Sequence, residues 1–114
     1  MRERRGSPRS GLVYYLEVRD ADSDALLGHL ADLTPDGLRL VGTSLSLQPD
    51  HGYRLRIAAP EGTTGTVVTC TAVCRWTGPD VNPDLQAAGL VFTDITEEQR
   101  LAIRDLIRSL GLAT

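Results

Sequence analysis

Short apolar segments, separated by turns rich in glycine, proline and aspartate, recur along nearly the whole of this 114-residue chain. Within a segment, apolar residues tend to alternate with polar ones, which is typical of a strand with one buried face. The clearest is YRLRIAA (53–59), in which arginines separate the apolar residues. The pattern predicts strands at 12–18, 26–34, 38–42, 53–59, 66–76 and 85–95. Short strands joined by turns favour a mainly β fold, a six-stranded antiparallel β-barrel.

The end of the chain follows a helical period instead. Thr96 and Gln99 have the spacing of a capping box, with acidic residues in the first turn between them. Apolar residues then recur at positions i, i+3, i+4 and i+7, which are Ile103, Leu106, Ile107 and Leu110. With Gly111 as a stop signal, the spacing predicts an amphipathic helix over about 96–110. We expect this helix to cover one opening or edge of the barrel.

Charge is distributed unevenly along the chain. Residues 1–9 contain four of the twelve arginines and one glutamate, a net charge of +3, so residues 10–114 carry −6 toward the total of −3. We therefore divide the chain into an arginine-rich arm (1–11) and a barrel with its helix (12–114). The acidic body disfavours general nucleic-acid binding, so any anion must be bound locally.

The cysteines and the apolar runs bear on the cellular compartment. Cys70 and Cys74 lie four positions apart in one predicted strand, which is about 13 Å at roughly 3.3 Å per residue. A disulfide needs Cα atoms within about 7 Å, so we expect two buried, reduced thiols. No apolar run approaches the roughly 20 residues that span a bilayer, and there is no secretory signal. These features predict a cytoplasmic protein without a membrane span.

The sequence lacks catalytic signatures. His29 and His51 have neither the partners of a catalytic triad nor the spacing of metal ligands. No glycine-rich phosphate loop precedes the predicted helix. We therefore expect a binding function, with no catalysis, no metal and no cofactor.

Binding chemistry is concentrated in the arm and in one turn. Arg5 and Arg9 are separated by three residues, and Asp32, Thr34 and Gly37 lie in the turn DLTPDG (32–37). A guanidinium binds phosphate oxygens or the O6/N7 edge of guanine bidentately. An aspartate or threonine oxygen can accept from guanine N–H groups, and glycine is suited to a positive φ in the turn. These residues predict a guanine-and-phosphate clamp.

In both motifs the sequence resembles the PilZ domain family. RGSPR (5–9), followed 23 residues later by DLTPDG, is similar to that family's Arg-x-x-x-Arg and Asp/Asn-x-Ser-x-x-Gly pair. Further segments occur in family order, namely YYLEV (14–18), GHLADLTPDGLRLV (28–41), CRW (74–76), GLVF (89–92) and the final helix. The resemblance implies a split β-barrel with a C-terminal helix, acting as a stand-alone bacterial receptor for cyclic diguanylate (cyclic di-GMP).

The resemblance also implies a set of ligand-binding residues. Arg5 and Arg9 would hold guanine edges and phosphates from the arm, with Arg4 as a further phosphate contact. On the barrel the implied residues are Asp32 and Thr34, which would hydrogen-bond a guanine, Gly37, which would let the turn close beneath it, and Arg75 at the end of the long strand. We expect the adjacent Trp76 to pack in the core or against the helix.

The residues depart from the family pattern at two places. Thr34 stands where the family usually has serine, and Ser10–Gly11 where an apolar anchor is common. We expect a receptor, monomer or dimer, that signals to a downstream protein partner when ligand orders the arm. The alternative is a ligand-independent PilZ-type adaptor that docks a partner protein. A single-strand nucleic-acid binder ranks third, because the chain offers only five aromatic residues on an acidic body.

Overall fold

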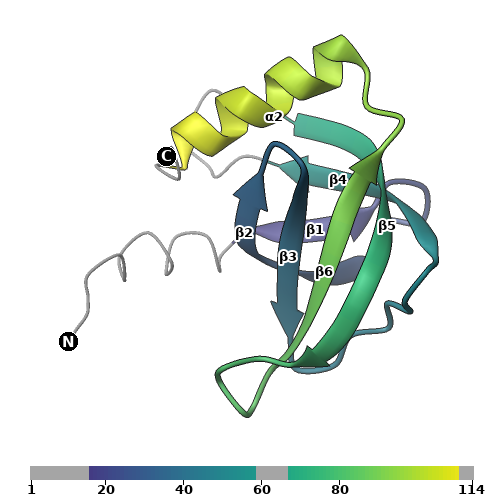
Figure 1. The fold of residues 1–114 in the computed structure, drawn as a ribbon, viewed down its shortest axis with the longest axis vertical. Helices are drawn as coiled ribbons and strands as arrows, with labels where there is room; N and C mark the ends of the chain where they lie inside the picture. The colour runs from purple at the N-terminus through teal and green to yellow at the C-terminus, as the bar shows by residue number, and fades with distance from the viewer. Residues whose placement is uncertain (1–15, 59–66, 111–114) are drawn as a thin grey trace.

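The computed structural model describes residues 16–58 and 67–110. Within these ranges it has six strands and one helix (Figure 1): β1 (Glu17–Asp20), β2 (Leu26–Thr34), β3 (Gly37–Gly42), β4 (Gly52–Ala58), β5 (Val67–Pro79), β6 (Gln86–Thr93) and α2 (Glu97–Ser109). Neighbouring strands are antiparallel, and the order β1-β2-β3-β6-β5-β4 closes into a barrel because β1 also pairs with β4. Closure pairs both outer strands of the sheet, which protects them from pairing with other chains. The predicted six-stranded antiparallel barrel is confirmed.

The apolar face of each strand fills the barrel interior. Leu55 and Ile57 of β4 are fully buried, whereas Arg54 before them is exposed and Arg56 between them is half-buried, as the alternation predicted. The largest fully buried side chains are Leu30, Leu40, Leu55, Ile57, Ile103, Leu106, Val18, Val68, Cys70 and Cys74. Full burial of one large aliphatic side chain contributes about 1.5–3 kcal/mol. This shared interior is therefore the main source of stability for the barrel.

Both cysteines belong to this interior. Cys70 and Cys74 are free and buried on β5, which confirms the expectation of two unpaired thiols. Burial raises the pKa of Cys70 to about 11. Burial also raises the pKa of Cys74, whose thiol donates to the carbonyl oxygen of Trp76 at 3.5 Å. Thiols kept in the neutral form are poor nucleophiles, so both act as core residues.

The helix α2 lies across one end of the barrel (Figure 1). Its first turn is closed by the predicted capping box, because the Thr96 hydroxyl accepts the N–H of Gln99 and the Gln99 side chain accepts the N–H of Thr96. Gln99 also donates to the carbonyl oxygen of Thr69 on β5 at 2.8 Å. The helix's own side chains Ile103 and Leu106 are fully buried. The predicted stop residue Gly111 lies outside the described residues. In the described part of the chain, no helix is long and apolar enough to cross a membrane.

Strand boundaries differ from the sequence prediction by one residue at the start of β3 and β4, and by more in β1, β5 and β6. β5 continues to Pro79 because residues 77–79 still pair with β6. β6 ends at Thr93, since Asp94 has a φ of 52° and turns the chain toward the helix. The first predicted strand, 12–18, begins at Glu17 in the described part and continues two residues further than predicted, to Asp20, while residues 12–15 lie outside that part.

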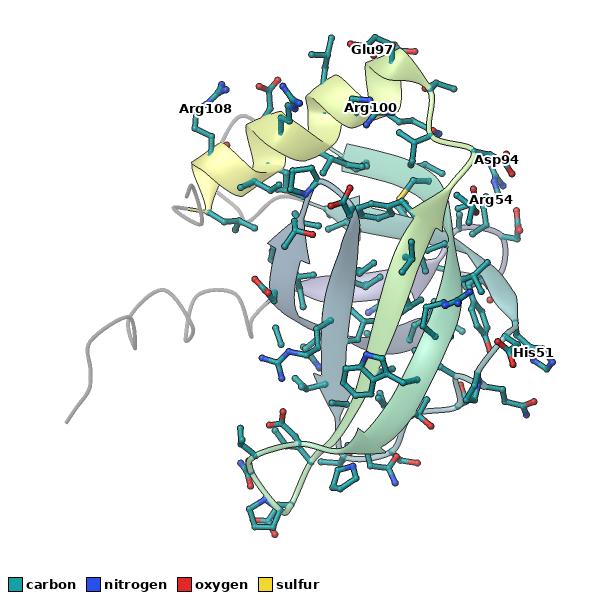
Figure 2. All side chains as sticks on the ribbon, in the orientation of Figure 1. His51, Arg54, Asp94, Glu97, Arg100 and Arg108 are labelled. Carbon is teal, nitrogen blue, oxygen red and sulfur yellow. The ribbon has the colours of Figure 1, made fainter. Side chains whose placement is uncertain are left out.

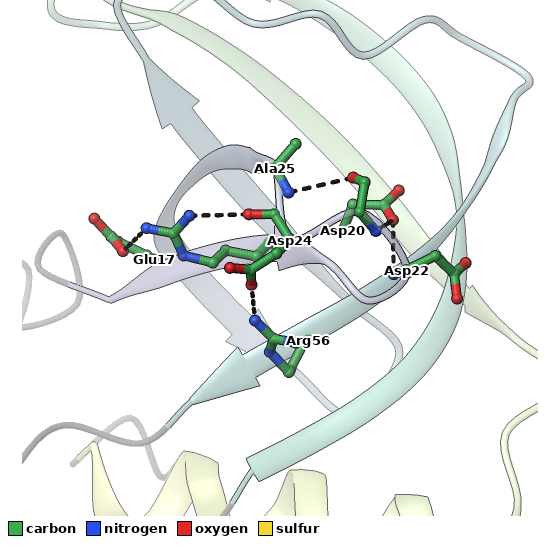
Figure 3. A network of polar contacts seen from close by, with 8 residues as sticks. Glu17, Asp20, Asp22, Asp24, Ala25 and Arg56 are labelled. Carbon is green, nitrogen blue, oxygen red and sulfur yellow. Dashed lines mark hydrogen bonds and ion pairs between the residues drawn. The ribbon is translucent and has the colours of Figure 1, made fainter.

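The β1–β2 turn is stabilised by a network of polar contacts (Figure 3). The Asp20 carboxylate accepts the backbone N–H groups of Ser23 at 2.9 Å and Asp22 at 2.8 Å, and these bonds lower the pKa of Asp20. Arg56 on the neighbouring strand β4 is ion-paired with Asp24. Exposed pairs of this kind contribute little to stability. Their importance here is that an outward arginine of β4 is already neutralised by a carboxylate.

Candidate ligand-binding site

The β2–β3 turn carries three of the predicted site residues. The Thr34 hydroxyl accepts the backbone N–H groups of Asp36 and Gly37, each at 3.3 Å, and donates to the Gly37 carbonyl oxygen at 3.4 Å. One donor and two acceptor lone pairs are all that a hydroxyl has. Thr34 therefore holds the turn in shape, and this role needs only the hydroxyl that threonine shares with serine.

Gly37 is needed for a different reason from the one predicted. Its φ does not lie in the left-handed region, so a positive φ is not what requires glycine here. A Cβ at this position would lie 2.1 Å from the carbonyl oxygen of Leu90 on β6. The absent side chain lets the start of β3 pack directly against β6, where Gly37 is paired with Val91.

A β-bulge places Asp32 on the outside of the barrel. Leu30 and Leu33 both point inward, with two residues between them instead of one. The extra residue is absorbed where the β2–β3 register shifts between Leu30 and Asp32. Asp32 is exposed and lies opposite Arg39 of β3, and its Oδ1 accepts the N–H of Leu33 at 3.0 Å.

A second bulge, on β5, turns Trp76 outward. The register between β5 and β6 shifts between Cys74 and Trp76, so that Arg75 and Trp76 are both exposed after the buried Cys74. The Trp76 side chain is 45% exposed and lies over Gly89 of β6, where a Cβ would come within 2.1 Å of the indole Nε1. The expectation that Trp76 packs in the core or against the helix is wrong, because the bulge turns its side chain outward over β6.

These side chains border one hollow on the outer wall of the barrel, of about 310 Å³, which we call the site hollow. Its lining residues are Asp32, Thr34, Asp36, Gly37, Leu38, Arg39, Arg75, Trp76, Gly89, Leu90 and Val91. The structure thus brings together four of the predicted site residues, Asp32, Thr34, Gly37 and Arg75. The other three, Arg4, Arg5 and Arg9, lie outside the described residues.

Sequence reasoning missed Arg39 as a member of this group. It lies on β3 two residues after Gly37, and its outward position is the one that strand alternation predicts. Its Nη1 donates to Asp80 Oδ1 at 2.9 Å. The alternation of LRLVG, together with the nearness of Arg39 to the motif glycine, is the signal that would have found it.

A larger hollow of about 900 Å³ lies elsewhere on the barrel and shares no lining residue with the site hollow. Leu26, Leu45, Val81 and Leu85 give it an apolar lining, and it includes none of the predicted site residues. Volume by itself does not identify a ligand site, since ligand specificity comes from convergent polar groups. We therefore place the candidate site in the smaller hollow.

Metal chemistry has no counterpart in the described residues. No group of three or more His, Cys, Asp or Glu side chains there is placed to hold a metal ion. His51 is exposed and projects outward from the loop before β4 (Figure 2), whereas His29 lines the larger hollow.

Comparison with known proteins identifies the family. The family model for the PilZ domain matches residues 3–109. The chain belongs to the PilZ domain family. PilZ domains are receptor and adaptor domains that bind cyclic di-GMP and partner proteins. None of the curated proteins compared matches this PilZ domain.

Solved structures share the fold of this PilZ domain. The Bacillus subtilis inhibitor of motility, MotI/DgrA, is 21% identical with a TM-score of 0.67, over 87% of this chain and 48% of its own. This PilZ domain therefore spans about half the length of that protein. The PilZ domain of CeSA from a cellulose-synthesizing bacterium is 17% identical with a TM-score of 0.54, over 84% of this chain and 90% of its own. At these identities the likeness is one of fold.

Proposed function

We propose that this PilZ domain is a receptor for cyclic di-GMP that binds its ligand in the site hollow and signals to a partner protein. The observation that supports this most directly is the meeting of Asp32 and the Thr34–Gly37 turn with Arg75 and Trp76 in one accessible hollow. The carboxylate comes from β2, whereas the guanidinium and the exposed indole come from β5, which is distant in the sequence.

Each group has a task that matches one part of a guanine nucleotide. The exposed Asp32 carboxylate is an acceptor for the N1–H and N2–H groups of guanine. The Trp76 indole is a stacking surface for the base, and base–aromatic stacking contributes about 1–3 kcal/mol. Arg75 is a cation for a phosphate oxygen. The hydroxyl of Thr34 acts indirectly, by holding the turn that presents these groups.

The arm completes the proposed site. A hollow of about 310 Å³ is at the small end of ligand pockets, which range over roughly 300–1,000 Å³. It offers room for one part of a molecule with two guanines and two phosphates. Arg5 and Arg9, with Arg4 beside them, would hold the remaining guanine edge and phosphates. Ordering the arm costs about 1–2 kcal/mol per residue fixed, which the new contacts must exceed.

Titration calorimetry with cyclic di-GMP tests the proposal, with GTP as the control nucleotide. We expect binding of cyclic di-GMP with favourable enthalpy and no heat with GTP. Asp32→Ala should weaken binding roughly tenfold or more, because a charged acceptor for guanine is removed. Asp105→Ala is the matched control, since Asp105 is an exposed aspartate on α2 whose ion pair is with Arg108, three residues later on the same helix. Equal binding by wild type and Asp32→Ala would contradict the proposed site.

The ligand-independent adaptor is the second candidate function. It is favoured by the larger hollow, where the exposed side chains of Leu26 and Val81 offer an apolar surface to a partner. The two functions separate in the same titration. If neither heat nor a change in melting temperature accompanies cyclic di-GMP, the adaptor is the better description.

A further inference from the structure

Four side-chain positions form a row across the outer wall of the barrel. Asp32 on β2 is paired with Arg39 on β3, Arg39 with Gly89 on β6, and Gly89 with Trp76 on β5. Directly paired residues of antiparallel strands have Cβ atoms about 4.5–5.5 Å apart. The row therefore presents, in order, a carboxylate, a guanidinium and an indole lying over a glycine, all of them lining the site hollow.

Asp80 holds the guanidinium of Arg39 at this wall. The Asp80 side chain is 2% exposed, and its Oδ1 accepts Arg39 Nη1 at 2.9 Å. Its Oδ2 accepts the N–H of Asn82 at 3.3 Å, and its own backbone N–H donates to the carbonyl oxygen of Leu85 at 3.0 Å. Asp80 is thus fixed within the β5–β6 loop, and it restricts the rotamers that Arg39 can adopt.

Arg39 keeps donors for a ligand. A guanidinium has five N–H donors in a planar fork. Of the donors of Arg39, only Nη1 makes a hydrogen bond with a residue that the structure describes. The Arg39 side chain is 36% exposed and borders the site hollow, so a ligand there can reach it.

The charges around Arg39 favour a base edge over a phosphate. Asp80 is bonded to Arg39 and Asp32 is its cross-strand neighbour, so the three side chains together carry a net charge of −1. A phosphate placed at Arg39 would meet the Asp32 carboxylate at close range, and like charges repel. A neutral base that offers acceptors to the guanidinium and donors to the carboxylate fits both groups.

We propose that Arg39 donates to O6 and N7 of a guanine in the site hollow and is a specificity-determining residue for guanine over adenine. Guanine carries the O6 and N7 acceptors beside its N1–H donor, which matches Arg39 beside Asp32. Adenine has the N6 amino group where guanine has O6, so it would set a donor against a donor. Asp80 is a positioning residue for Arg39. This inference rests on the proposed function.

A double-mutant cycle between protein and ligand tests the contact. The ligands are cyclic di-GMP and its 7-deaza analogue, in which a C–H replaces guanine N7. The variant is Arg39→Leu, and dissociation constants are measured by calorimetry for all four combinations. We expect Arg39→Leu to weaken cyclic di-GMP binding roughly 5- to 100-fold. The same substitution should weaken binding of the 7-deaza analogue less, by a factor at least about threefold smaller than for cyclic di-GMP. The reason is that the analogue has already lost the contact between Arg39 and guanine N7.

Two further variants keep the test independent of folding. Arg39→Lys leaves a cation beside the buried Asp80 carboxylate but removes the planar fork. It should melt near the wild-type temperature and lose the same coupling to N7. Arg56→Leu is the matched control, because Arg56 is 38% exposed and also ion-paired with an aspartate, on β4 away from the site hollow. It should bind both ligands as the wild type does.

Each outcome of the cycle has one meaning. Loss of coupling in Arg39→Leu and Arg39→Lys, with wild-type behaviour in Arg56→Leu, supports the contact. Equal weakening of both ligands by Arg39→Leu means a general charge effect and overturns the contact, and so does unchanged binding, while the proposed function stands in both cases. Failure of the unaltered chain to bind cyclic di-GMP overturns the proposed function and this inference together.

Discussion

Two glycines shape the site by what they lack. At Gly37 a Cβ would meet the backbone oxygen of Leu90, and at Gly89 it would meet the indole of Trp76, each at 2.1 Å. The first obstacle is backbone and belongs to the packing of β3 on β6. The second is a side chain on the barrel surface. Gly37 is therefore required by the fold, whereas Gly89 leaves the space in which the exposed Trp76 ring packs against β6.

Gly89→Ala should displace the Trp76 indole and weaken cyclic di-GMP binding several-fold, since stacking contributes about 1–3 kcal/mol. Intrinsic tryptophan fluorescence reports the displacement directly, because Trp76 is the one tryptophan of the chain. Gly78→Ala is the matched control: a Cβ at Gly78, on the same strand as Trp76, meets nothing within 4 Å. A wild-type emission spectrum and wild-type affinity in Gly89→Ala would contradict the indole's role.

At the scale of elements, two bulges decide which side chains reach the site. Strict alternation after the buried Leu30 of β2 and the buried Cys74 of β5 would have turned both Asp32 and Trp76 into the barrel interior, whereas both are exposed. The bulges after Leu30 and Cys74 insert one residue into each strand and turn the following side chains outward. Because bulges depend on the pairing of distant strands, periodicity within one segment does not reveal them.

The helix, by contrast, is determined locally at its start. Thr96→Ala should lower the free energy of unfolding by about 1 kcal/mol, because the N–H of Gln99 loses its capping acceptor. Chemical denaturation measures the change. Thr96→Ser is the control and should restore most of the stability, since serine caps as well as threonine. Equal stability of Thr96→Ala and wild type would mean that packing of Ile103 and Leu106 alone holds the helix in place.

At the scale of the whole molecule, one thiol buried in the closed barrel makes the free energy of unfolding depend on pH. The pKa of Cys70 is about 11 in the folded chain against an ordinary value of 9.0. Between these values the unfolded chain releases a proton that the folded chain retains, which favours unfolding as pH rises. The contribution is fully present below about pH 9 and is lost toward pH 11.

The free energy of unfolding of the wild type should therefore fall between pH 9 and 11, and it should fall less steeply in Cys70→Ala. Denaturation at a series of pH values measures both slopes. The variant will be less stable at every pH because of the cavity it creates, so only the difference in slope is diagnostic. Parallel slopes would show that the thiol stays accessible to base in the folded barrel.

Much of this molecule follows from local sequence patterns. Alternation placed all six strands, the Thr96–Gln99 spacing placed the start of α2, and the two motifs identified the family and the turn that carries Asp32 and Thr34. These features depend on residues within a few positions of one another, and the physics that connects them acts over the same range. The prediction of Arg4, Arg5 and Arg9 as ligand residues stays a prediction, because they lie outside the described part of the chain.

Tertiary structure alone decided the wall of the site. This wall depends on the outward turn of Trp76, the fit of its indole over Gly89, the clearance at Gly37 and the pairing of Arg39 with Asp80. These contacts join residues that are 13 to 53 positions apart in the sequence. The shortest separation is between Trp76 and Gly89, and the longest is between Gly37 and Leu90. Each contact depends on the register with which β3, β5 and β6 meet. That register is set when the whole barrel closes around its core, and no segment carries it alone.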